Sequence, residues 1–154
     1  MITIEIAQHF QQAPADPARL EELVRFVCEH FAVTRAVVSL GIVDDAEISR
    51  LNEQYLGHRG TTDCLSFDLS EDGDAGRDRV FDVIVNGELA LREAARRGHA
   101  GAAELALYIT HGLLHNLGFD DATPEQAREM HRRENEILQH LGYGLVYDDD
   151  GPVQ

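Results

Sequence analysis

The chain has 154 residues, of which 44% are hydrophobic and 27% charged, and this size supports one domain with its own hydrophobic core. No segment approaches the roughly 20 uninterrupted apolar residues of a membrane helix, and the N-terminus lacks a signal-peptide pattern, so we expect a cytoplasmic protein without a membrane partner. The formal net charge of -15 repels phosphate backbones at long range, so a nucleic-acid ligand would require a local basic patch or a partner that presents it.

The N-terminal segment predicts a strand followed by a helix. Ile2, Ile4 and Ile6 alternate with polar residues, as in a half-buried strand. Asp16 and Pro17 then supply a capping side chain and a proline suited to the first helical turn. The apolar stripe expected on this helix consists of Leu20, Leu23, Val24, Val27 and Phe31.

A second strand and a short helix follow. Residues 36–43 form an apolar run typical of a buried strand. Ile48, Leu51 and Tyr55 have the spacing of a helix face, and Gly57 is suited to end that helix in a left-handed conformation.

Two more strand patterns occupy residues 64–69 and 80–85. The connection at 71–78 is rich in Gly and Asp, which indicates an exposed turn or loop. The two strands are therefore expected to form a long-looped hairpin, although their pairing and the order of the sheet stay open at this point.

The second half of the chain is predicted to be helical. Asn86 can cap a helix that stops at Gly98, and residues 102–117 form a second helix whose apolar residues cover most of its circumference, which indicates a buried, central helix. Thr123-Pro124 begins the last helix with a cap and a first-turn proline, and Gly142 ends it.

The order of these elements predicts the fold class. Four strands and five helices in this arrangement indicate an α+β domain, in which one mostly mixed four-stranded sheet is covered by helices. We assign residues 1–147 to this single domain and residues 148–154 to an acidic C-terminal tail.

The chemistry concentrates at the end of the central helix. His111 and His115 are four residues apart, so both imidazoles lie on one helix face and can bind one ion. Gly118 can turn the chain back, which brings Asp121 to the same ion. This H-x-x-x-H-x-x-G-x-x-D pattern predicts one zinc ion with two nitrogen ligands, one carboxylate ligand and an open position for water, the arrangement of a hydrolytic site.

Two alternatives accompany this prediction. A single histidine on an apolar helix is usually a hydrogen-bonded core residue, but a pair at this spacing followed by Gly and Asp favours a metal. His131, eight residues into the last helix, is an alternative third ligand, although Asp121 has the better chain geometry.

Gly112 excludes the most familiar class of zinc hydrolase. In H-E-x-x-H metallopeptidases the Glu after the first His is the general base, and here Gly112 takes its place. We interpret this glycine as opening space beside the metal for a backbone or substrate.

These residues resemble the YbeY family of endoribonucleases. The family signature H-G-x-L-H-x-x-G-[YF]-D-H is matched by His111, Gly112, Leu114, His115, Gly118, Phe119 and Asp120, and its final His is replaced by Asp121. Two segments upstream also resemble conserved blocks of the family. The first block includes Leu51-Asn52, Tyr55 and residues 62–67, and the second is residues 82–85.

The resemblance implies a zinc-dependent endoribonuclease that acts on single-stranded RNA by metal-activated water. It implies roles in ribosomal RNA maturation and ribosome quality control, partners among ribosomal RNA or ribosomal particles, and a fold related to the zinc metalloproteases. A basic residue that follows Tyr55 in the family is Leu56 here, so His58, Arg59 and Ser66 become the candidates for RNA contact. No catalytic residue is assigned, because a proton acceptor such as Asp120 or a substrate oxygen cannot be chosen from the sequence.

Two other functions remain open. Leu56, Asp121 and the acidic composition are also compatible with a non-catalytic, ribosome-associated assembly factor that holds a structural metal. A metallopeptidase with the same ligands is less favoured, because it needs a replacement for the missing general base.

Overall fold

A computed structural model describes residues 1–71 and 78–144, and the predicted order of elements is confirmed. The elements are β1 (Ile2–Gln8), α1 (Pro17–His30), β2 (Ala36–Val43), α2 (Asp45–Leu56), β3 (Cys64–Asp68), β4 (Arg79–Asn86), α3 (Gly87–Arg97), α4 (Gly101–Asn116) and α5 (Pro124–His140). The middle of the predicted acidic loop, the tail at 148–154 and the domain boundary at 147 lie outside the described residues.

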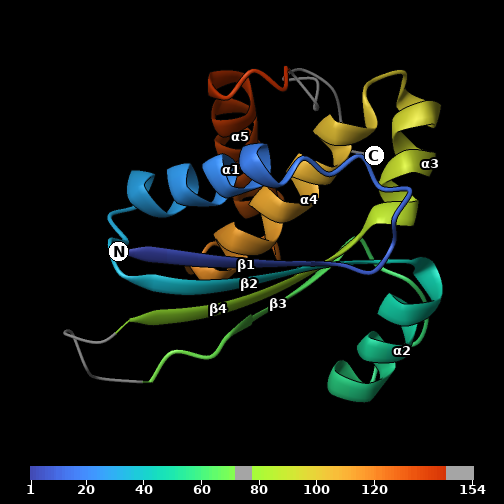
Figure 1. Ribbon diagram of the computed structural model, residues 1–154, viewed down its shortest axis with the longest axis horizontal. Helices are drawn as coiled ribbons and strands as arrows, with labels where there is room; N and C mark the ends of the chain where they lie inside the picture. The colour runs from blue at the N-terminus through green and yellow to red at the C-terminus, as the bar shows by residue number, and fades with distance from the viewer. Residues whose placement is uncertain (72–77, 145–154) are drawn as a thin grey trace.

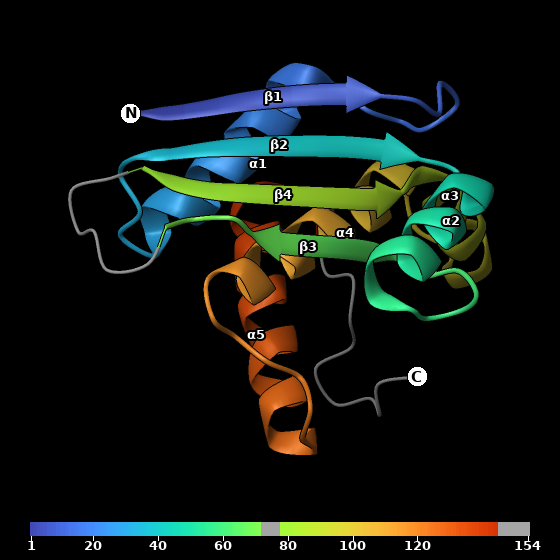
Figure 2. The same cartoon turned by 90° about the horizontal axis from the view of Figure 1, so that it is seen from below.

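The four strands form one mixed sheet in the order β1-β2-β4-β3. The pairs β1–β2 and β2–β4 are parallel, whereas β3 runs antiparallel to β4, which confirms the predicted hairpin (Figure 2). In this register Ser66 of the edge strand β3 stands opposite Val83 of β4. Strand β3 therefore forms one border of the sheet, next to which α5 extends outward (Figure 2).

The helices cover the two faces of the sheet unequally (Figure 1). Helices α1, α3, α4 and α5 lie on one side, and α2 lies on the other side near the carboxyl ends of β2 and β4. The main core forms between the sheet and the first group, where every residue from 103 to 110 of α4 is buried. A second, smaller cluster of Val43, Ile48 and Leu65 lies under α2.

Local signals explain where the helices begin and end. Asp16 and Asn86 accept hydrogen bonds from the first turns of α1 and α3, and Thr123 with Gln126 forms a complete capping box at the start of α5. Gly57 follows α2 in the left-handed conformation that L side chains rarely adopt. Among the described residues, no helix is both long enough and apolar enough to cross a bilayer.

Candidate metal centre

The last turns of α4 present the two histidines of the motif on one face. The Nε2 atoms of His111 and His115 are 3.1 Å apart, and the two rings meet edge to face with centroids 4.6 Å apart. Both side chains are partly buried, and the helix that carries them is packed into the core on its other faces. The pair is therefore held in position before any ligand binds.

Gly118 returns the chain to the histidines. It has φ +101°, a left-handed conformation, and its amide donates to the carbonyl of His115. The reversed chain brings Asp121 Oδ2 to 3.4 Å from His111 Nε2 and 3.6 Å from His115 Nε2. The three predicted ligand groups thus lie together, in a cluster that faces solvent through Asp121.

The hydrogen bonds on the far side of each ring assign the tautomers. His111 Nδ1 lies 2.6 Å from Glu134 Oε2, and His115 Nδ1 lies 3.2 Å from the backbone carbonyl of Phe119. Both partners are acceptors, so each Nδ1 carries the proton and each Nε2 is left with a lone pair. Two lone pairs and one carboxylate oxygen then converge on the same point.

This convergence fits a small cation. Ligands 2.0–2.1 Å from a tetrahedral zinc ion are separated by about 3.3–3.4 Å. The three separations of 3.1, 3.4 and 3.6 Å between the two Nε2 atoms and Asp121 Oδ2 bracket that value. Without a cation or a shared proton, the facing lone pairs and the carboxylate repel one another.

The electrostatic surroundings also favour positive charge at this point. Burial alone lowers the pKa of His111, but the hydrogen bond and charge of Glu134 outweigh it, and Asp63 and Asp121 act in the same direction, so the pKa is raised. The acidic groups that raise this pKa stabilise a metal cation at the same place.

Gly112 permits the close approach of a neighbouring element, and that element is the sheet. A Cβ at this position would lie 2.8 Å from Val83 Cγ1 and 3.7 Å from both Cys64 Sγ and Ser66 Cβ. The glycine thus faces the sheet, and its missing side chain lets α4 pack closely against β3 and β4. Ser66, one of the three predicted RNA contacts, therefore lies against α4 at Gly112, the residue that follows His111 in the chain.

The other two predicted RNA contacts lie further away along the chain. His58 and Arg59 are exposed in the connection between α2 and β3. Neither side chain makes a hydrogen bond or ion pair with another described residue, so both are available to solvent and to an anionic ligand. The structure brings neither of them into the cluster of His111, His115 and Asp121.

Helix α5 contributes two further groups near the cluster. His131 is close enough to sense the charges of Glu134, His111 and Asp121, but it is not one of the three converging groups, and burial lowers its pKa. Glu134 was missed from the sequence. Its signal is an acidic residue on the buried face of α5, at i+4 from Met130 and i−3 from Ile137.

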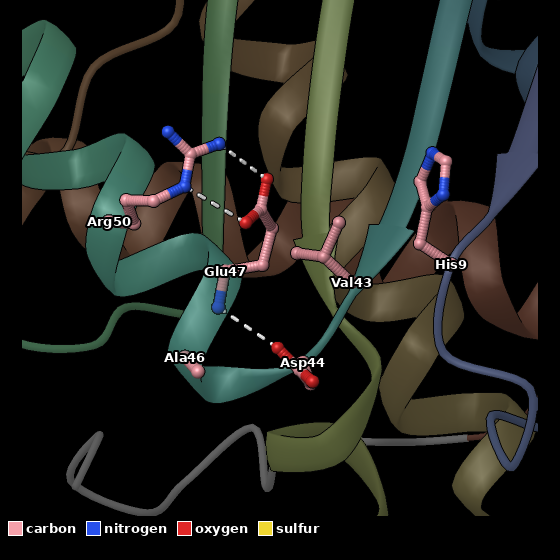
Figure 3. Close-up of a pocket in the computed structure, with 6 residues that line it drawn as sticks. All are labelled: His9, Val43, Asp44, Ala46, Glu47 and Arg50. Atoms are coloured by element: carbon pink, nitrogen blue, oxygen red, sulfur yellow. Dashed lines mark hydrogen bonds and ion pairs between the residues drawn. The ribbon is translucent and has the colours of Figure 1, made fainter.

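A separate pocket lies at the carboxyl end of β2, where this strand leads into α2 (Figure 3). It has a volume of about 500 Å³ and is lined by His9, Val43, Asp44, Ala46, Glu47 and Arg50. Three of its charged groups already have partners. Arg50 forms an ion pair with Glu47, and Asp44 accepts a hydrogen bond from the Glu47 amide to cap α2. The pocket shares no residue with the histidine cluster, which we retain as the candidate site.

Comparison with known proteins agrees with the sequence and the geometry. The family model described as Endoribonuclease YbeY matches residues 4–142. The chain is 35% identical to Endoribonuclease YbeY of Thermobifida fusca over 144 residues, which span 89% of this chain and 92% of the relative. It is 34% identical to Endoribonuclease YbeY of Bacillus licheniformis over 151 residues, which span 92% of this chain and 96% of the relative.

A solved structure supports the fold. The solution structure of TM1509 from Thermotoga maritima superposes with a TM-score of 0.58 and covers 99% of this chain and 100% of that protein, at 21% sequence identity. From the family model and the relatives together, the chain belongs to the YbeY family of endoribonucleases.

Proposed function

We propose that this protein is a zinc-dependent endoribonuclease that cleaves single-stranded RNA, in ribosomal RNA maturation and ribosome quality control in the cytoplasm. The observation that carries the proposal is the convergence of the two Nε2 atoms of His111 and His115 and one carboxylate oxygen of Asp121 at separations of 3.1–3.6 Å. Family membership supplies the reaction class, because the matching relatives are named endoribonucleases.

The donor set favours zinc and leaves room for chemistry. Two imidazoles and one carboxylate are a common set for catalytic zinc, and they leave a fourth tetrahedral position for water or substrate. When bound, such an ion lowers the pKa of coordinated water toward about 7 and polarises a phosphoryl oxygen. His111, His115 and Asp121 would hold the ion, and Asp121 lies on the solvent side of it.

RNA would approach from the side of β3. Ser66 lies against α4 at Gly112, which is next to His111 in the chain, and a hydroxyl there could donate to a phosphate oxygen. Arg59 and His58 are exposed near the same edge strand and would attract the backbone electrostatically. The family resemblance predicts a basic residue at the position of Leu56, which is exposed. Contact with phosphate would therefore depend on His58 and Arg59 instead.

The direct test is cleavage of several single-stranded RNAs by the purified protein. Cleavage should disappear with a chelator, return with zinc, and be absent from a His115→Ala variant. His9→Ala is the matched control, because His9 lies in the separate pocket near α2. Equal cleavage by the His115→Ala variant, or no cleavage of any RNA by the zinc-loaded protein, contradicts the proposal.

A second candidate function rests on the exposed Leu56 and on Asp121. Loss of a basic side chain and replacement of a histidine ligand would suit an assembly factor that binds ribosomal particles without cutting RNA and holds a structural ion. The stability of the metal-free protein separates the two functions. A metallopeptidase is disfavoured, because Gly112 faces the sheet and leaves no carboxylate in the place of the general base.

A further inference from the structure

Glu134 is a buried carboxylate whose presence in the core requires an explanation. Its side chain is 0% exposed, and its Oε2 accepts a hydrogen bond from His111 Nδ1 at 2.6 Å. Its Oε1 has no hydrogen-bond partner among the described residues. An ionised carboxylate in this state is costly to bury unless positive charge lies nearby.

A second buried carboxylate, that of Glu104, can be compared with Glu134. Glu104 of α4 is also buried, at 1% exposed, and it contacts His99 Nε2 at 2.5 Å. It has a second cation in reach, since Arg97 Nη1 lies 3.9 Å from its other oxygen. Glu134 instead has an imidazole of the metal cluster as its hydrogen-bond partner, and the converging donors lie on the other side of that ring.

The position of Glu134 is fixed by packing rather than by the histidine. Neighbouring residues on the same face of α5, Met130, Ile137 and Leu138, are buried in the main core. The carboxylate is thus presented to α4 from a separate element, 23 residues away from His111 along the chain. A rigidly held acceptor of this kind fixes both the ring orientation and the position of the proton.

We propose that Glu134 is the positioning residue of the metal centre, which holds His111 in the Nδ1-protonated form and strengthens donation from its Nε2. This inference rests on the proposed function, because it assumes that the three converging groups bind an ion. A divalent ion would also explain the buried charge: its two positive charges balance the carboxylates of Glu134 and Asp121.

Zinc binding by purified protein, without RNA, tests the proposal. Glu134→Gln keeps the size of the side chain and an oxygen acceptor but removes the charge. We expect its zinc affinity, measured by competition with a chromophoric chelator, to fall about 10–100-fold. The absorption spectrum of the cobalt-substituted variant should also change, because the ring of His111 is held less firmly.

Glu104→Gln is the matched control. It removes the charge of another buried, histidine-bonded carboxylate, so it should reduce stability while leaving zinc affinity and the cobalt spectrum unchanged. A Glu134→Gln variant with lower melting temperature but unaltered zinc affinity and cobalt spectrum would show a merely structural role and overturn the proposal.

A second measurement, on the wild-type protein, tests the proposal even if the Glu134→Gln variant fails to fold. In the zinc-loaded wild-type protein, imidazole ¹⁵N–¹H spectra should show a His111 Nδ1 proton that is shifted downfield and exchanges slowly with water, and an unprotonated Nδ1 overturns the proposal. Failure here is distinct from failure of the proposed function. If zinc binding depends on Glu134 but the protein does not cleave RNA, the positioning role is supported and the proposed function is contradicted. If the protein cleaves RNA but its zinc affinity does not depend on Glu134, only the positioning role is contradicted.

Discussion

Asp121 is the residue at which this chain departs from the signature of its family. A carboxylate in place of a neutral imidazole adds negative charge to the ion, so coordinated water should be less acidic than with three histidines. The side chain of Asp121 is 42% exposed, in contrast to the two more buried histidines. The third ligand position is therefore the one most easily changed without disturbing the core.

We predict that Asp121→Ala lowers zinc affinity by at least about 10–100-fold, because a direct ligand should matter no less than a supporting residue. Asp121→His should retain or strengthen zinc binding, since it supplies an imidazole at the position of the final His in the signature that the chain resembles. His131→Ala is the control and should change zinc affinity little. If His131 were required and Asp121 dispensable, the assignment of the third ligand would be wrong.

The clustering of His111, His115 and Asp121 could be predicted because the three residues lie close together in sequence. Two turns of helix and one glycine turn fix the relation between His111, His115 and Asp121, and all of these signals are local. Glu134 could not be predicted with equal ease, because its role depends on how α5 packs against α4. The element that approaches Gly112 could not be predicted for the same reason, since the sequence does not say which face of α4 meets β3 and β4.

At the scale of elements, one polar network joins the start of α2, the end of β4 and the start of α3. Asp45 Oδ1 accepts from Asn86 Nδ2 at 2.6 Å and from Thr61 Oγ1 at 3.0 Å, and its Oδ2 accepts from Arg92 Nη1 at 2.7 Å. These contacts anchor one end of the connection that carries Arg59. The hydrogen bond from Arg92, with those from Asn86 and Thr61, lowers the pKa of Asp45 to about 2 despite partial burial.

This shift predicts a pH-dependent contribution to stability. The pKa in the folded state lies below the unfolded value of about 4, so the ionised Asp45 stabilises the fold above pH 4, and the contribution is lost as the pH falls toward 2. Asp45→Asn should therefore lower the free energy of unfolding at pH 7, and its difference from the wild type should narrow between pH 4 and pH 2. Urea unfolding at several pH values measures this difference. If the difference in the free energy of unfolding between the two proteins stays constant from pH 4 to pH 2, the substitution acts through packing and not through the charge of Asp45.

The elements themselves could be predicted well because each helix carries its own boundary signals. The capping box at Thr123 and the left-handed glycines at 57 and 98 are readable over a few residues. The strand order could not be predicted from the sequence. β2 lies between β1 and β4, and its pairing with β4 joins residues far apart in the chain, such as Val38 and Phe81.

At the scale of the whole molecule, the main core is separate from the metal centre. The core cluster spans the sheet, α1, α4 and α5, whereas the converging groups lie at its border and reach solvent through Asp121. A domain of this size does not need a metal to fold. The ion is therefore expected to add to stability by binding the folded state rather than to create the fold.

Removal of the metal tests this expectation. The chelator-treated protein should keep its helical circular dichroism and unfold cooperatively in urea, and free zinc at 100 times its Kd should add about 2.7 kcal/mol to the free energy of unfolding. His115→Ala should lose this zinc-dependent increment. An unfolded metal-free protein would support the structural ion of the assembly-factor function.

The net charge of -15 also acts on the whole molecule. All 13 basic side chains are arginines, and several of them pair with acidic neighbours, as Arg50 does with Glu47 and Arg96 with Glu93. Such pairs neutralise charge locally and leave little long-range attraction for RNA. Under the proposed function, we therefore expect recognition of RNA to depend on exposed cations such as Arg59, which pairs with no acidic group among the described residues.

The closeness of α4 and α5 in the chain has a consequence for synthesis. The three candidate ligand groups and Glu134 all lie between residues 111 and 134, so they leave the ribosome after the four strands and α1. Glu134 can reach His111 only after α5 has been made and has packed against α4, and the short intervening loop costs little entropy to close. Under the proposed function, a nascent chain would therefore complete its metal site, and gain the ability to cut RNA, only late in its synthesis.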